Sequence, residues 1–193
     1  MLYALPQPTD RKLSRQAAEV VAGLLGSKVV SDRQIVIGEP QCHYAVRLNT
    51  EHFWFGARFS PSIYVTGGTH KRIGNAVVPF FASLKMPDRR MLADTLLPRA
   101  SAELRIPVFV SEIGHGPIAS EILCSAEVRE RIGELDFQTI RTFLISPMQI
   151  RVIGQFSDAS QAARQIMVQR DLLESIYRRA MPPNTSLERT RGR

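Results

Sequence analysis

Apolar residues in the first part of the chain recur every three or four positions, which predicts a helix over residues 11–25. Thr9 or Asp10 would cap its start, because a side-chain oxygen there accepts a hydrogen bond from a free amide of the first turn. Gly26 would end the helix in the left-handed conformation that closes many helices. We expect one face of this helix to pack on the core, formed by Leu13, Ala17, Val20, Val21 and Leu24.

From residue 28 the apolar positions alternate with a period of two, which is typical of β-strands. Ile35 and Ile37 mark the first strand, and Gly38 and Pro40 end it. The connections that follow are too short for parallel crossovers, so these strands should form an antiparallel meander. Its further strands are expected over residues 43–49, 52–59 and 63–66.

The register of the first long hairpin depends on its turn. A two-residue turn at residues 50–51 places Leu48 opposite Phe53. Since residues that face each other lie on one side of a sheet, that register gives one wholly apolar face. Thr-Glu is not a favoured pair for such a turn, so a longer, bulged turn with a shifted register is the alternative.

The rest of the chain alternates between shorter helices and strands. Helices are expected over residues 73–84, 89–97, 100–104 and 126–135, the first kinked at Pro79 and the last capped by Ser125. Strands are expected over residues 106–110, 118–123, 137–145 and 148–156, the last two joined through Ser146 and Pro147.

The longest helix is predicted over residues 159–181, with Ser157 or Asp158 as its N-cap. Its expected core face consists of Ala159, Ala162, Ala163, Ile166, Leu173, Ile176 and Tyr177. Its expected outward face consists of Arg164, Gln165, Arg170, Glu174 and Arg178. Pro182 and Pro183 stop the helix, because proline lacks the amide that would continue it.

These patterns together predict an α+β fold. Antiparallel β-hairpins or a meander form one sheet or two adjoining sheets, which an N-terminal helix and a long C-terminal helix cover. We expect a loose lead-in over residues 1–10, a single globular domain over 11–181 and a disordered basic tail over 182–193.

Composition adds limits on the class of protein. With 44% hydrophobic and 22% charged residues, the 193-residue chain can bury a core. The longest apolar stretch, residues 73–84, is far shorter than the roughly 20 residues of a membrane span. The N-terminus has neither the basic start nor the long apolar run of a secretory signal, so we expect a cytoplasmic protein in which Cys42 and Cys124 are reduced.

The net charge of +7 can come from a GC-rich genome as easily as from a binding surface, and most of it is interleaved with acidic residues. One group of cations stands beside the single tryptophan, on the second face of the predicted hairpin. Basic and aromatic groups on an open sheet bind nucleic acids by neutralising phosphates and stacking bases. The candidate polyanion surface consists of Arg47, His52, Trp54 and Arg58, helped by Lys71 and Arg72 after a glycine turn. The alternative is an ordinary solvated sheet face.

Catalytic and metal-binding patterns are weak. The sequence contains no Gly-x-Ser-x-Gly elbow, no Cys-x-x-Cys and no His-Glu-x-x-His, and we expect no metal or cofactor. Cys124 is the one candidate nucleophile, because a predicted strand-to-helix junction would place it where a helix N-terminus lowers a thiol pKa. His115 is the nearest candidate base.

We therefore favour a non-catalytic binding or structural module that acts through contacts with an unknown protein partner. A nucleic-acid or polyanion binder using the first hairpin is the alternative. An enzyme with a Cys/His site is the second alternative, which the sequence disfavours. The oligomeric state is not predicted, and the chain shares no motif with a family that would settle its function.

Overall fold

A computed structural model of the chain describes residues 11–31, 34–39, 42–53, 56–66, 82–84, 95–110, 116–138, 140–147, 149–154 and 158–180. Its helices are α1 (Arg11–Leu24), α3 (Pro98–Leu104), α4 (Gly116–Leu123), α5 (Ala126–Gly133) and α6 (Ala159–Ala180). Its strands are β1 (Lys28–Ser31), β2 (Gln34–Glu39), β3 (Cys42–Phe53), β4 (Gly56–Thr66), β5 (Ala82–Leu84), β6 (Thr95–Leu96), β7 (Val108–Val110), β8 (Ile140–Ser146) and β9 (Gln149–Gly154).

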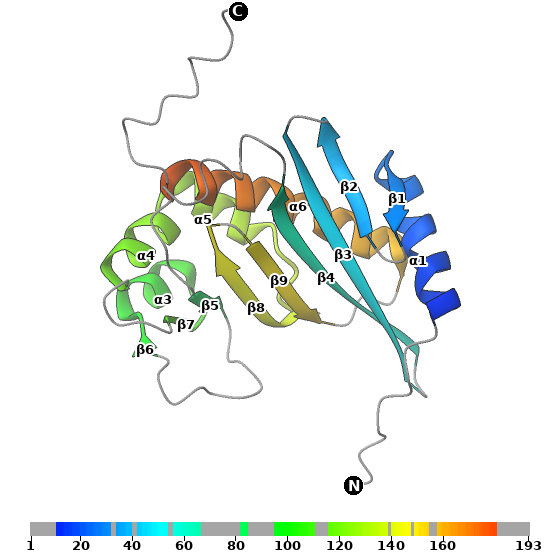
Figure 1. Cartoon of the computed structure of the whole chain (residues 1–193). Coiled ribbons are helices and arrows are strands. Elements are labelled where there is room, and N and C mark those ends of the chain that lie inside the picture. The colour runs from blue at the N-terminus through cyan, green and yellow to red at the C-terminus, as the bar shows by residue number, and fades with distance from the viewer. Residues whose placement is uncertain are drawn as a thin grey trace, which may run out of the picture.

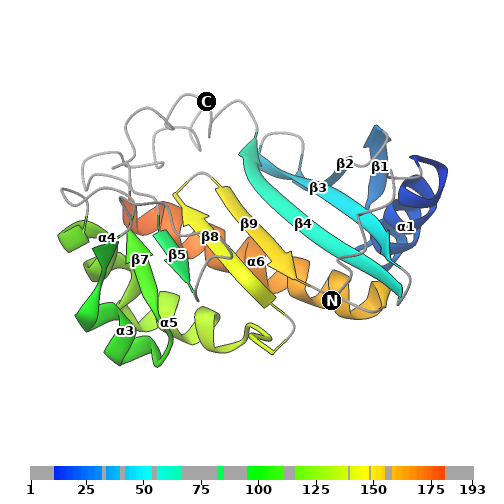
Figure 2. The ribbon, with the colours of Figure 1, turned by 90° about the horizontal axis from the view of Figure 1, so that it is seen from below.

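The strands of the described residues form one antiparallel sheet in the order β1-β2-β3-β4-β9-β8-β5-β7-β6. The long helix α6 crosses one face of this sheet behind β4, β9 and β8 (Figure 1). It contacts α1 at one end and α4 and α5 at the other, so the helices form a layer against the sheet (Figure 2). The predicted α+β class and the two packing helices are confirmed.

The core lies between the sheet and α6. Strand residues such as Ile35, Val46 and Ile150 are fully buried. From the helix side the core receives Ala162, Ile166, Leu172, Leu173 and Ile176, all completely or almost completely buried. Removing this apolar surface from water is the main favourable contribution to the fold.

Helix α1 confirms the predicted element and its end. Gly26 has a φ of 63°, the left-handed conformation. The amide of Ser27 donates to the carbonyl of Ala22 at 2.8 Å, and that of Gly26 donates to the carbonyl of Gly23 at 3.2 Å. This pair of bonds is the Schellman motif, which satisfies carbonyls left free at the helix end.

The predicted core face of α1 is wrong in part. Ala18, Val21 and Ala22 are buried, whereas Val20 and Leu24 are 55% and 54% exposed. Helix α1 contacts α6 and β3, and the side that carries Val20 and Leu24 stays exposed. The side chains of Leu13 and Ala17 lie outside the described residues.

The register of the first long hairpin also differs from the prediction. β3 continues through residues 50–51, and Leu48 pairs with Pro61 instead of Phe53. The turn therefore joins Phe53 to Gly56, and β4 runs without a break to Thr66. Period-two alternation predicts the strands but not the position of the turn in a long hairpin, because the same alternation is compatible with several turn positions.

The structure differs from the expected elements in three other segments. Residues 116–123 form helix α4 instead of a strand, because Ile118, Ala119, Ile122 and Leu123 also match helical spacing. Residues 82–84 and 95–96 form strands β5 and β6, where we expected the ends of two helices. Leu97 is extended and precedes α3, and the rest of those two expected helices lies outside the described residues.

The later elements largely match the prediction. The hairpin of β8 and β9 turns after Ser146, which pairs with Gln149, and Asp158 accepts a hydrogen bond from the amide of Gln161 at 2.7 Å as the N-cap of α6. Gln165, expected to point outward, is only 8% exposed, and its side-chain oxygen accepts a hydrogen bond from the amide of Asp136. Ser125 precedes α5 without capping it, since its hydroxyl donates to the carbonyl of Ile122. The expected lead-in over 1–10 and the tail from residue 182 lie outside the described residues.

Candidate functional site

The candidate polyanion surface stays a prediction. The backbone of Arg47 pairs with Ser62, that of His52 with Ala57 and that of Arg58 with Glu51. Five positions separate Arg47 from His52 on β3, so the alternation of a strand assigns them to opposite sides of the sheet. The register that brought the four hairpin residues together is therefore absent.

The side chains of those hairpin residues, like all of Trp54, Lys71 and Arg72, lie outside what the structure describes. Position alone does not decide whether the surface binds an anion. The nucleic-acid alternative consequently receives no new support from the described residues.

Cys124 lies between two helices, α4 and α5, instead of at the expected strand-to-helix junction. It directly follows the end of α4, and its amide donates to the carbonyl of Ser120 at 3.0 Å. Burial, with the nearby carboxylate of Glu103, raises the pKa of the Cys124 thiol, although a hydrogen bond with Ser120 opposes this shift. A raised pKa leaves less of the nucleophilic thiolate, and His115 lies outside the described residues.

An open pocket of about 300 Å³ lies between the starts of α3 and α4 and strand β7. It is lined mainly by apolar groups, from Thr95, Leu97, Pro98, Arg99, Val110, Gly116, Pro117 and Ser120. Its charged residue, Arg99, bonds to Glu103 at 3.0 Å, and this contact lowers the pKa of the Glu103 carboxyl. Among the described lining residues, Arg99 is the one ionisable side chain, and it is 73% exposed.

Alkylation of Cys124 tests whether the thiol is reactive. At pH 8 we expect iodoacetamide to modify Cys124 in the native protein at least about tenfold more slowly than in the unfolded chain, because burial and the raised pKa both suppress the thiolate. The raised pKa stabilises the folded protein below the pKa of the unfolded thiol, and this contribution is lost as pH rises through the folded pKa. Mass spectrometry of the Cys124 peptide measures the modification rates of the native and the unfolded protein over pH 7–10. Modification that is faster in the native protein than in the unfolded chain would contradict this prediction and favour the enzyme hypothesis.

The other notable surface is the outward side of α1, which we call the α1 outer face and define as Val20, Gly23 and Leu24. Val20 and Leu24 are one helical turn apart. Among the described residues, the remaining large apolar side chain with comparable exposure is Leu96, at the other end of the sheet.

Gly23 precedes Leu24 and is also exposed. A Cβ atom added there would meet nothing within 4 Å. Gly23 is the penultimate residue of α1, and its carbonyl accepts a hydrogen bond from the amide of Gly26 in the motif that ends the helix. The sequence did contain a signal: the apolar arc of α1 is wider than one buried face requires, since both Val20 and Val21 belong to it.

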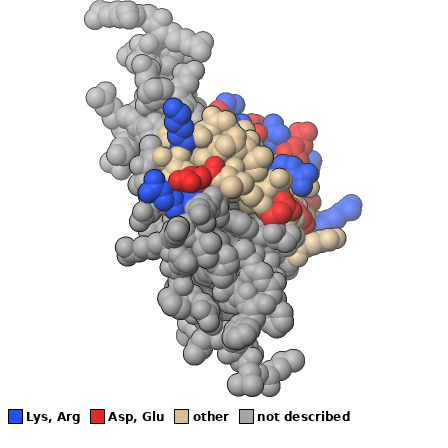
Figure 3. Space-filling model, turned by 90° about the vertical axis from the view of Figure 1, so that its right-hand side faces the viewer, with Lys and Arg blue, Asp and Glu red and all other residues tan. Residues whose placement is uncertain are grey.

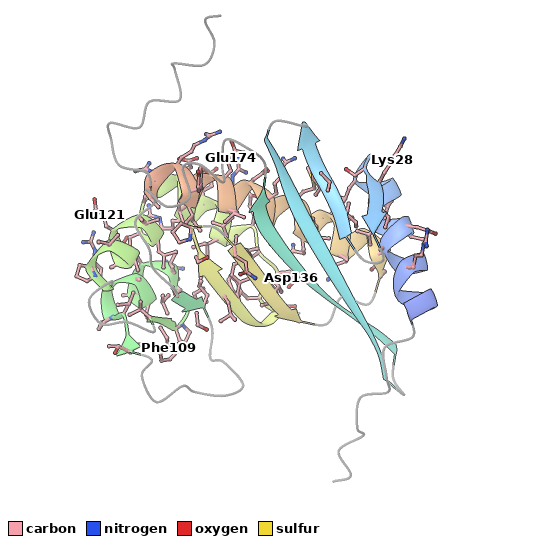
Figure 4. All side chains as sticks on the ribbon, viewed as in Figure 1. Lys28, Phe109, Glu121, Asp136 and Glu174 are labelled. Atoms are coloured by element: carbon pink, nitrogen blue, oxygen red, sulfur yellow. The ribbon has the colours of Figure 1, made fainter. Side chains whose placement is uncertain are left out.

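Charges of both signs surround the α1 outer face. Arg15 and Glu19, which precede Val20 on the helix, form an exposed ion pair with 3.1 Å between Nε and Oε1. Exposed Lys28 follows the helix on the other side, at the end of the molecule opposite Glu121 (Figure 4). Figure 3 shows this end of the molecule, with uncharged surface between basic and acidic groups.

In comparisons with known proteins, no family model, no curated protein and no solved structure matches the chain.

The described residues also bear on metal binding and membrane insertion. Within the described residues, no three His, Cys, Asp or Glu side chains are grouped so that they could hold a metal ion. None of the helices that the structure describes is long and apolar enough to cross a membrane.

Proposed function

We propose that this chain is a non-catalytic binding module that acts through protein contacts, with the α1 outer face as its contact surface. The observation that carries the proposal is the pair of exposed side chains, Val20 and Leu24, on a helix whose opposite side is buried. Single exposed apolar residues are common on proteins, but two adjacent ones beside an open glycine form a compact apolar surface.

Binding at this surface has a clear driving force. Burying an exposed valine or leucine completely gains about 1.5–3 kcal/mol, and roughly half of each side chain is available here. The surrounding charges can then orient the partner, since electrostatic complementarity contributes mainly to specificity and association rate. A protein partner provides both an apolar contact and fixed charges.

Site-specific photo-crosslinking tests this function. A benzophenone amino acid at position 20 of the full chain should give protein adducts after irradiation in the producing cells, because a bound partner lies against that position. The same amino acid at Glu130, which is exposed on α5, is the matched control and should give few adducts. Absence of adducts at position 20, or equal yields at both positions, would contradict the proposal.

A further inference from the structure

We propose that the pocket between α3, α4 and β7 binds a small monocarboxylic acid, with the apolar body of the ligand in the pocket and its carboxylate at the guanidinium of Arg99. This site goes beyond the proposed protein contact, because it lies at the opposite end of the molecule from α1 (Figure 1). The two proposals therefore stand or fail independently.

The inner part of the pocket is apolar and shielded from water. Leu97 and Val110 are 9% and 1% exposed, and Gly116 is buried as well. A Cβ atom added at Gly116 would lie 3.2 Å from Cδ2 of Leu97, so a side chain at this position would crowd the floor of the pocket. An apolar group that fills such a concave floor displaces water from apolar surface, which favours binding.

The rim of the pocket carries a cation in a geometry that suits a carboxylate. Arg99 is exposed, and its Nε donates a hydrogen bond to Oε1 of Glu103 at 3.0 Å. This bond uses one of the five N–H donors of the guanidinium. The N–H groups on the two terminal nitrogens form a fork that binds both oxygens of a carboxylate.

Glu103 holds Arg99 without neutralising it alone. The other carboxylate oxygen of Glu103, Oε2, lies 3.5 Å from Nη1 of Arg129, so one carboxylate stands between two guanidinium groups. The hydrogen bond to Glu103 is the main cause that raises the pKa of Arg99, and the charge of Glu121 on α4 has a smaller effect. Arg99 therefore stays charged and keeps a fixed place beside the pocket.

The lining favours a ligand with a single negative charge. Arg99 is the one ionisable side chain among the described lining residues, and most of the remaining lining is apolar. A ligand with two negative charges would place the second against apolar groups, which is costly. A volume of about 300 Å³ is at the lower end of the range for ligand pockets, so the apolar body is expected to be small.

NMR titration of the full, ¹⁵N-labelled chain with octanoate tests the proposal. The amide signals of Val110, Gly116 and Ser120 should shift together and saturate with a Kd of about 0.1–1 mM, a range that suits so small a ligand. Octanamide has the same length and no charge, and it should bind about threefold to fivefold more weakly, because an exposed ion pair contributes modestly.

Two variants locate the two parts of the ligand. Arg99→Met should lower the affinity for octanoate to that for octanamide and leave the affinity for octanamide unchanged. Ser120→Leu should abolish the binding of both ligands, since the larger side chain takes up space in the pocket. Thermal melting and circular dichroism show whether each variant remains folded.

Arg178→Met is the matched control for the charge. Arg178 is also an exposed arginine that bonds to a glutamate four residues away, Glu174, but it lies on α6. The control should bind octanoate with the affinity of the unmodified chain. An equal loss of affinity in Arg99→Met and Arg178→Met would mean that octanoate responds to net charge instead of to this site.

Three other results would overturn the proposal. They are the absence of saturating shifts up to about 10 mM octanoate, well above the expected Kd, equal affinities for octanoate and octanamide, and shifts confined to the amides of Val20 and Leu24. The last result would place octanoate on the α1 outer face. The crosslinking yields at position 20 decide the proposed protein contact separately from any of these outcomes.

Discussion

Replacing Phe143 with alanine is expected to lower the free energy of unfolding by about 3–5 kcal/mol. Phe143 is among the largest side chains that are completely buried. Its strand, β8, pairs with β9 on one side and β5 on the other, and Phe143 itself pairs with Val152 and Leu84. Its ring also packs edge-on against Phe137, with centroids 6.4 Å apart. The variant thus loses apolar burial and an aromatic contact at the strand that joins the two parts of the sheet.

Guanidinium denaturation followed by fluorescence and circular dichroism measures this loss. Leu96→Ala is the control and should change stability by less than about 0.5 kcal/mol, because Leu96 is exposed on an edge strand. We also expect both signals to change in one transition, since residues 11–181 are predicted to be a single domain. Two separate transitions, with only one shifted by Phe143→Ala, would show that the sheet belongs to two independent units.

Replacing Gln169 with methionine is expected to raise the free energy of unfolding by about 1–3 kcal/mol. Gln169 lies in the middle of α6 with no exposed surface, and among the described residues neither its side-chain nitrogen nor its oxygen has a hydrogen-bond partner. Folding therefore removes the amide from water without compensation. Methionine has a similar length and shape but no such polar group, so it should fill the same space.

Two further variants make the Gln169 prediction specific. Gln165→Met changes the same residue type one helical turn away, but Gln165 accepts a hydrogen bond from the Asp136 amide at 3.2 Å, so that variant should lose stability. Gln169→Glu should be strongly destabilising, because it buries a charge. A less stable Gln169→Met protein would mean that the amide has a partner, for instance an internal water.

The sequence was most informative where one periodicity dominates a long segment. The limits of α1 and α6 could be read from spacing and from Gly26 and Asp158, because local backbone chemistry decides where a helix starts and ends. Short apolar segments were ambiguous. Residues 118–123 match both a buried strand and a helix, and only their packing against α6 and α5 selects α4.

The candidate site, too, could be predicted from the sequence only in part. The wide apolar arc of α1 was visible in the sequence, but it was interpreted as a single core face. Which part of that arc is buried depends on which side of α1 contacts α6 and β3. In the structure the buried side carries Ala18 and Ala22. The surface of Val20, Gly23 and Leu24 therefore emerged only from the packed structure.

The sequence by itself determined that this protein is α+β, with helices at both ends of an antiparallel sheet, because hydrophobic period and capping residues act locally. It also excluded familiar metal and nucleophile motifs, since those depend on residue types at short spacing. The tertiary structure alone decided the pairing of Leu48 with Pro61, the raised pKa of Cys124 and the exposure of Val20 and Leu24. Each of these depends on contacts between segments that are distant along the chain, and such contacts are fixed only when all the elements pack together.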